Sequence, residues 1–262
     1  MLGEGAARPA GTAVKDGGRR PLRNAVALVA GVFACWQIAY WIVGDVALRS
    51  PWQTLRFTVE LTQTHLFWLH LANTLQAFAA ALAIAVALGL AIGFGLGMHR
   101  LSADAMEPML VALYSIPKIT LYPILLLAFG LGMSAKVAFG ALHGIIPVAL
   151  FTLNAVRGIE PILLKTGRVL KLDASAMVRS ILFPAAVPEI FTGLRVGFSL
   201  TLIGTVLGEM FAAQHGLGYL LMNAIGLYNV DVIMSVTFLL VVFAATVNGA
   251  LLAIDRRLHF RA

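Results

Sequence analysis

Long apolar runs separated by short polar segments dominate the chain. Four runs contain no Asp, Glu, Lys or Arg: 25–43, 71–97, 137–156 and 232–254. Two further runs carry few charges: 109–132, with Lys118, and 189–213, with Glu189, Arg195 and Glu209. A helix needs about 20 mostly apolar residues to cross a bilayer, and runs of this length are helical by default. The pattern predicts six transmembrane helices in an all-α polytopic membrane protein.

The segments between these runs are too short to form a second domain. The longest are 44–70 and 157–188, whereas an independent domain needs about 50 residues or more. We therefore expect residues 21–262 to form a single transmembrane domain with a cytoplasmic loop at 157–188. Residues 1–20 are rich in Gly, Ala, Arg and Pro and are predicted to be a disordered cytoplasmic tail.

The composition excludes several classes of protein. Hydrophobic residues make up 60% of the chain and charged residues 12%, against about 45–50% and about 25% in soluble domains. This excludes a soluble enzyme, and the single cysteine, Cys35, excludes a disulfide scaffold. The net charge of +7 is interpreted as loop topology, not as nucleic-acid binding.

Basic residues predict the orientation in the membrane. With the N-terminus in the cytoplasm, 14 Lys and Arg residues lie on the cytoplasmic side, and three lie outside: Arg49, Arg56 and Lys136. This bias satisfies the positive-inside rule. Both termini are therefore expected in the cytoplasm.

Motifs for catalysis, nucleotide binding and metal binding are absent from the sequence. It has no Gly-x-x-x-x-Gly-Lys-[Ser/Thr], no His-Glu-x-x-His and no Gly-x-Ser-x-Gly. We therefore predict no catalytic residues, no metal site and no bound cofactor. His143 is alone in the fourth run and is interpreted first as a packed core histidine.

Glycines recur every fourth residue at Gly89, Gly93 and Gly97, and in the pairs Gly193/Gly197 and Gly204/Gly208. Such spacing removes side chains from one face of a helix, so another helix can approach closely. Tight packing inside the bundle is the favoured interpretation, and a dimer interface or a moving surface is the alternative.

The loop 157–188 contains signals for two short amphipathic helices. Pro161 suits the first turn of a helix that runs to about Lys171. Asp173 is a good N-cap for a second helix from Ala174, and Pro184 is predicted to end it. The pair is either an interfacial element on anionic lipid or a docking element for a soluble partner.

This loop and the chain around it resemble the membrane permease subunits of bacterial binding-protein-dependent ABC importers. The resemblance favours the branch that imports nitrate, taurine, sulfonates and thiamine precursors. It rests on Ile181 with Phe183-Pro184, on the run from Pro184 through Pro188 and Gly193 to Arg195, on Gly208-Glu209-Met210 and Gly216-Leu-Gly218-Tyr, and upstream on Ile116-Pro117-Lys118-Ile119, Pro123 and Phe129-Gly130-Leu-Gly132. Together these motifs cover about residues 70–258.

The resemblance implies a type I importer fold, a multi-pass location in the bacterial inner membrane and several partners. These are two cytoplasmic ATPase subunits that use the ATP, a second permease copy, an external solute-binding protein and the lipid bilayer, with no nucleic acid. The coupling residues would be Lys165, Thr166, Gly167, Val169, Leu170, Lys171, Asp173, Met177 and Pro184.

The chain departs from the family pattern within this loop. Lys165-Thr166-Gly167 replaces the family's Glu-Ala-Ala, and Lys171 replaces a glycine. A lysine in the left-handed conformation that suits this glycine costs about 1 kcal/mol, unless the corner is built differently.

A self-sufficient secondary transporter or channel for a small anion is the alternative function, and a structural membrane subunit is a third. Arg195 and Glu209 are too far apart to pair, and snorkelling explains both. Pro117 and Pro123 flank Lys118 and are expected to break the helix there. Candidates for the translocation pathway are Lys118, Thr120, His143, Asn154, Ser199 and Glu209. The sequence does not identify the substrate.

Overall fold

The computed structural model describes residues 20–259, and over this range the chain is helical, with no strand. The disordered tail predicted at 1–20 lies outside the described residues except for Arg20, which begins the first helix. The chain divides into two compact units between Gln53 and Thr54, and each unit is described by itself.

The first unit contains helix α1, Arg20–Val43, and the beginning of α2, Pro51–Thr62. Gly44 turns the chain after α1 with a φ of 76°. Ser50 and Gln53 then form a capping box at the start of α2. The Ser50 hydroxyl accepts from the Gln53 amide at 3.2 Å, and the Gln53 side chain accepts from the Ser50 amide at 2.8 Å.

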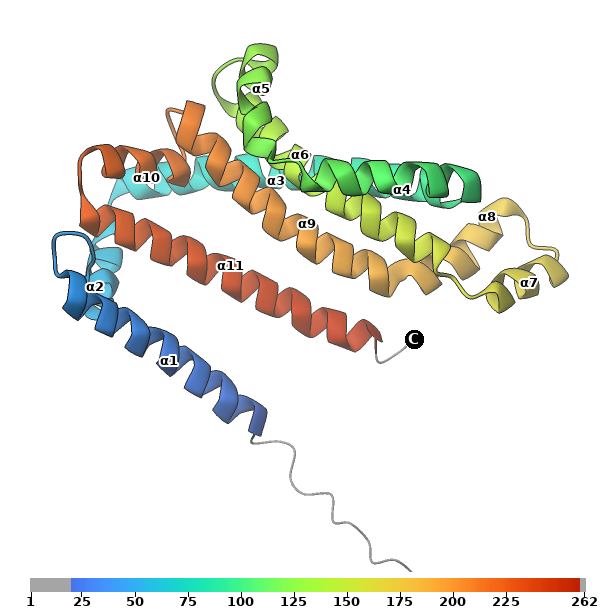
Figure 1. Cartoon of the computed structure of the whole chain (residues 1–262), viewed down its shortest axis with the longest axis horizontal. Coiled ribbons are helices and arrows are strands. Elements are labelled where there is room, and N and C mark those ends of the chain that lie inside the picture. The colour runs from blue at the N-terminus through green and yellow to red at the C-terminus, as the bar shows by residue number, and fades with distance from the viewer. Residues whose placement is uncertain (1–19, 260–262) are drawn as a thin grey trace, which may run out of the picture. The chain divides into compact units, whose positions relative to one another are not determined.

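The core of the second unit is built from three long helices (Figure 1). They are α3, His65–Gly97, α6, Met133–Arg157, and α9, Phe183–Ala212, and α6 packs along both of the others. The most apolar stretch of α6 is 61% buried, against 11% for α11, Val230–His259. Helix α6 is therefore the central helix of this unit.

The glycine pattern is explained by these contacts. A Cβ on Gly89 would lie 2.6 Å from Val148 Cβ of α6, and one on Gly97 would lie 2.9 Å from Val156 Cβ. On α9, a Cβ on Gly193 would lie 2.5 Å from Phe151 Cβ. The interpretation of tight packing inside the bundle is confirmed for these positions.

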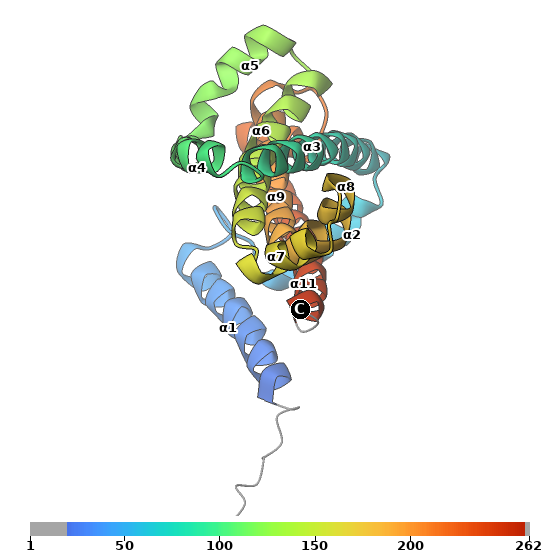
Figure 2. The ribbon, with the colours of Figure 1, turned by 90° about the vertical axis from the view of Figure 1, so that its right-hand side faces the viewer.

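The predicted third span is not one straight helix. Helix α4, Arg100–Ser115, is followed by a short 3₁₀ turn, Lys118–Leu121, and by α5, Tyr122–Phe129, and the axis bends by 86° between them. Figure 2 shows α5 turned steeply away from α4. The cause is Pro117, because Ile116 takes the extended conformation that a residue before proline prefers, with ψ 133°. The break expected around Lys118 is confirmed.

Five described helices are long and apolar enough to cross a membrane, and the bent α4/α5 pair makes a sixth if it counts as one span. The fifth predicted span is longer than expected at its N-terminal end. Pro184 was predicted to end the second loop helix, and this prediction is wrong. The residue lies in the first turn of α9. A π-helical turn, Val178–Leu182, joins α8, Ala174–Met177, directly to α9, so no residue between them leaves the helix.

Candidate functional site

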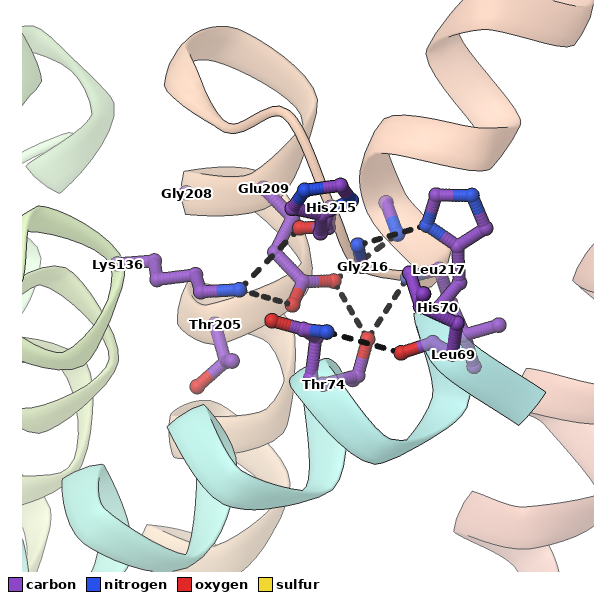
Figure 3. A network of polar contacts seen from close by, with 12 residues as sticks. Leu69, His70, Thr74, Lys136, Thr205, Gly208, Glu209, His215, Gly216 and Leu217 are labelled. Atoms are coloured by element: carbon purple, nitrogen blue, oxygen red, sulfur yellow. Dashed lines mark hydrogen bonds and ion pairs between the residues drawn. The ribbon is translucent and has the colours of Figure 1, made fainter. Parts of the chain in front are cut away.

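A charged pair is buried where the C-terminal part of α9 meets the first turn of α6 (Figure 3). Lys136 Nζ lies 3.2 Å from Glu209 Oε1, and the two side chains are 3% and 0% exposed. The prediction that Glu209 snorkels to the interface is therefore wrong. Lys136, which was predicted to lie between two spans, lies in the first turn of α6. A buried ion pair is tolerated only when its remaining hydrogen-bonding groups also find partners.

Glu209 finds those partners on two other helices. Its Oε2 accepts from the Thr74 hydroxyl of α3 at 2.8 Å and from the Gly218 amide of α10, Leu217–Gly226, at 3.0 Å. Thr74 in turn accepts from the Leu217 amide at 2.7 Å. His70 Nδ1 accepts from the Gly216 amide at 3.0 Å. Side chains of α3 and α9 thus satisfy three successive amides at the start of α10, which have no partner within the helix.

Glycines make this close approach to Glu209 sterically feasible. Gly216 has a φ of 127°, which a residue with a side chain rarely adopts. A Cβ on Gly218 would lie 2.7 Å from Glu209 Cβ. The Gly216-Leu217-Gly218 segment therefore fits around the carboxylate because it lacks side chains at both glycine positions.

The other side of the network is formed by α6 and α5. Lys136 Nζ donates to the His215 carbonyl oxygen at 3.2 Å, and the Tyr122 hydroxyl donates to the Gly208 carbonyl oxygen at 2.6 Å. The network therefore ties α3, α5, α6, α9 and α10 together at the end of α9 opposite the 157–188 loop (Figure 1). In the part of the chain that the structure describes, no group of three His, Cys, Asp or Glu residues could hold a metal ion.

The 157–188 loop forms a corner from α7, Pro161–Val169, and the α8/π-helical segment. Pro161 lies in the first turn of α7, and Asp173 Oδ1 accepts from the Ala176 amide at 3.1 Å, so both helix starts are as predicted. Lys171 has a φ of 51°. The lysine thus takes the left-handed conformation that suits the family's glycine, and the corner is not built differently.

Gly167 is the point where the two helices of the corner touch. It is buried, and a Cβ at this position would lie 2.6 Å from the Met177 sulfur. Met177 is therefore half-buried inside the corner, whereas Val169 and Leu170 are 80% and 64% exposed. Lys165, Thr166 and Lys171 are exposed beside them.

Arg157 fixes the start of this corner to the neighbouring helix. Its guanidinium pairs with Asp104 at 2.6 Å and with Glu107, and both carboxylates belong to α4. The C-terminal end of α6 is therefore bound to α4 directly before the loop begins.

The residues predicted for the pathway do not form one group. Lys118 donates to the Tyr114 carbonyl oxygen at 3.0 Å, and Thr120 donates to the Pro117 carbonyl oxygen at 2.8 Å, both at the α4/α5 break. Asn154 is exposed near the C-terminal end of α6.

The remaining pathway candidates pack against different helices. His143 is buried, with Nδ1 2.9 Å from the Phe139 carbonyl oxygen and its ring packed on Phe139, as a core histidine would be. The Ser199 hydroxyl accepts from the side-chain carboxamide of Asn248 in α11 at 2.7 Å.

The second charge of the fifth predicted span also has a partner. Arg195 lies 3.3 Å from Asp255 of α11 and is 26% exposed. Snorkelling therefore does not explain this residue, because its guanidinium is held by a carboxylate of a neighbouring helix.

Thr74, His70 and Lys136 belong to the network but were not among the residues predicted for the site. Lys136 directly precedes the charge-free run 137–156, so a rule based on apolar runs places it outside the membrane. Its partner lies 73 positions further along the chain. Nothing in the local sequence indicates that pairing.

Comparison with known proteins gives consistent matches. A model of the family described as "Binding-protein-dependent transport system inner membrane component" matches residues 84–262. The taurine transport system permease protein TauC of Escherichia coli is 27% identical over 92% of this chain and 91% of its own length. The riboflavin transport system permease protein RibX of Chloroflexus aurantiacus is 36% identical over 76% of this chain and 75% of its own. The nitrate import permease protein NrtB of Synechocystis is 30% identical, covering 84% and 82%.

The fold also matches solved structures. A structure of the MetNI methionine ABC transporter in an inward-facing conformation matches with a TM-score of 0.59 and 22% identity, over 71% of this chain and 93% of that chain. A second crystal form gives a TM-score of 0.58 at 19% identity. The type I importer permease fold expected from the sequence is confirmed.

Proposed function

Since the chain belongs to the family of binding-protein-dependent transport system inner membrane components, we propose that it couples ATP hydrolysis by a separate subunit to solute import through its α7/α8 corner. We define this docking corner as residues 160–184. The observation that supports it most directly is the exposure of Val169 and Leu170, at 80% and 64%. Their exposure where α7 ends and the turn to α8 begins leaves apolar area for a partner.

The charged residues around this apolar area favour a partner surface of opposite charge. Lys165, Lys171 and Arg179 are exposed on the same segment, and basic groups at the rim of an interface steer association with acidic groups. Because Lys165 stands where the family pattern has a glutamate, the facing surface of the ATPase subunit is expected to be acidic.

The docking proposal is tested by placing charge in the apolar contact. The variant Val169→Asp/Leu170→Asp should lose capture of the ATPase subunit and lose transport, because desolvating two carboxylates in an interface costs several kcal/mol. Met177 is left unchanged because it packs against Gly167 inside the corner. Binding is measured by co-purification of the two subunits from membranes.

Leu101→Asp provides the matched control. Leu101 is 86% exposed, in the first turn of α4 and outside the docking corner. This variant should keep its ATPase subunit. If the double variant also keeps it, the corner is a pair of lipid-surface helices.

We further propose that a second copy of this chain completes the pathway, that two ATPase subunits bind the pair, and that an external binding protein delivers the solute. The relatives are named for taurine, aliphatic sulfonates and nitrate, among other solutes. A small anion is therefore the proposed substrate class.

The alternative, a self-sufficient transporter, differs in its energy source. Uptake by the reconstituted complex should require ATP and should continue after ion gradients are collapsed with ionophores. Gradient-driven uptake by this chain alone, in vesicles without the ATPase subunit, would contradict the proposed function.

A further inference from the structure

A cavity of about 320 Å³ lies at the end of the second unit that carries α10, next to the buried ion pair. This volume is at the lower end of the range of small-molecule sites, about 300–1,000 Å³. The α5–α6 turn, the first turn of α6, the α9–α10 turn and one residue of α3 form its wall. Its lining residues are Asn73, Leu131, Gly132, Met133, Lys136, Ala213, Gln214 and His215.

The charge of the cavity is asymmetric. Among the described residues that line it, Lys136 has the one formal charge, and it is positive. Glu209, which neutralises Lys136 in the core, is fully buried and is not part of the lining. The one formal charge of the lining is therefore positive, and the carboxylate that pairs with it lies outside the lining.

The donors of the cavity suit an oxyanion. An ammonium group has three N–H donors, and Lys136 directs two of them to Glu209 and to the His215 carbonyl oxygen. These two contacts leave one N–H of the ammonium unused. The carboxamides of Asn73 and Gln214 and the imidazole of His215 also carry N–H groups.

We propose that this cavity is a binding subsite for the anionic group of a small solute, such as a sulfonate or nitrate, with Lys136 as its charged contact. The inference rests on the proposed function, because it assigns the imported anion to one place in the permease. Glu209 is a positioning residue here, because it holds the ammonium at the wall of the cavity and does not itself line it.

The subsite is tested by the reaction rate of a cysteine placed in its wall. In the full chain in nanodiscs, Cys35 is first replaced by Ser, and Gln214→Cys is then introduced. This variant is labelled with an anionic reagent, 2-sulfonatoethyl methanethiosulfonate, and with a cationic one, 2-(trimethylammonio)ethyl methanethiosulfonate. The ratio of the anionic to the cationic rate should exceed the ratio at Tyr228→Cys on the order of tenfold.

Tyr228 is the control because it is 89% exposed and lies in the turn after α10, outside the cavity lining. The neutral pair Lys136→Met/Glu209→Gln should reduce the ratio at Gln214→Cys to the control value, and the double change avoids leaving a buried charge unpaired. Lys136→Arg should keep the preference. Added methanesulfonate should slow the anionic labelling of Gln214→Cys and leave Tyr228→Cys unchanged.

Labelling requires neither the ATPase subunit nor a binding protein, so it separates the two proposals. Equal ratios at Gln214→Cys and Tyr228→Cys, or a preference that survives loss of both charges, would overturn the subsite even if ATP-driven uptake is normal. An anion preference that depends on Lys136 supports the subsite even if uptake proves independent of ATP.

Discussion

At the scale of single residues, Lys136 and Glu209 show how the chain accommodates opposite charges inside an apolar bundle. Each residue alone would be an uncompensated buried charge, because the pair is 3% and 0% exposed. Removing one partner of such a pair typically costs about 3–5 kcal/mol, and replacing both is often nearly neutral.

Lys136→Met is therefore expected to lower the thermal unfolding midpoint of the purified protein substantially. Lys136→Met/Glu209→Gln should recover most of that loss, because no buried charge remains. Unfolding is followed in detergent by loss of the monodisperse peak in size-exclusion chromatography. A double variant as unstable as the single one would show that the pair is not energetically coupled.

The sequence indicated only one half of this pair. Glu209 is visible as a charge inside an apolar run, and it was singled out as a pathway candidate on that basis. Lys136 was counted on the outer side because it lies between the predicted spans 109–132 and 137–156. Only the three-dimensional approach of α6 to α9 brings the two together.

At the scale of helices, the contact between α3 and α6 depends on residues without side chains. A Cβ on Gly93 would lie 2.7 Å from the Ala149 carbonyl oxygen of α6, and the backbone there cannot move aside easily. Gly95, two residues further along α3, has nothing within 4 Å of its added Cβ. The two glycines thus form a matched pair on opposite sides of one helix.

Gly93→Ala should destabilise the protein by about 1–3 kcal/mol through overpacking. Gly95→Ala should be neutral or stabilising by up to about 1 kcal/mol, because alanine is the better helix former. Thermal unfolding of the two variants under the same conditions checks both expectations. Equal stabilities would mean that α3 and α6 do not pack as closely as the structure shows.

The pairing of Arg157 with Asp104 and Glu107 gives the docking corner a fixed connection to α4. Arg157→Gln should reduce solute transported per ATP hydrolysed, because displacement of the corner then reaches α4 less directly. Arg100→Gln, which removes one exposed positive charge from the start of α4, outside the docking corner, should leave that ratio unchanged. Uptake and phosphate release by the reconstituted complex provide the ratio. The same decrease in both variants would attribute the effect to loss of positive charge in general.

The start of each helix in the corner was predictable, because proline and aspartate act on the backbone next to them. The π-helical turn at Val178–Leu182 was not. Taken alone, Pro184 predicts the end of a helix. Proline also suits the first turn of a helix, where an amide hydrogen is not needed. The choice between these two roles depends on how the segment packs.

At the scale of the whole molecule, the apolar runs predicted the number and order of the long helices, because burial in lipid requires length and composition that are visible locally. The sharp α4/α5 bend was foreseen only as a break, because proline sets where a helix stops and not the direction the chain takes afterwards.

The orientation of the chain remains a sequence-based prediction. Reporter fusions after Arg261 and at Gln53 should report opposite sides of the membrane, with the C-terminal fusion in the cytoplasm, because basic residues are concentrated on that side. Paired reporters, one active only in the cytoplasm and one only outside, give the result. Activity of both fusions on the same side would contradict the six-span topology.

The chain stays helical from Ala174 to Ala212 without an intervening loop, through a π-helical turn and past Pro188. At 1.5 Å per residue, the 30 residues of α9 span about 45 Å, with the docking corner at one end and Glu209 near the other. A loop between α8 and α9 would absorb a push by changing its own shape. Because no loop separates α8 from α9, displacement of the docking corner would tilt or translate the helix as a whole. If the proposed docking corner is displaced, the movement would reach the five elements held together around Glu209 through this one helix.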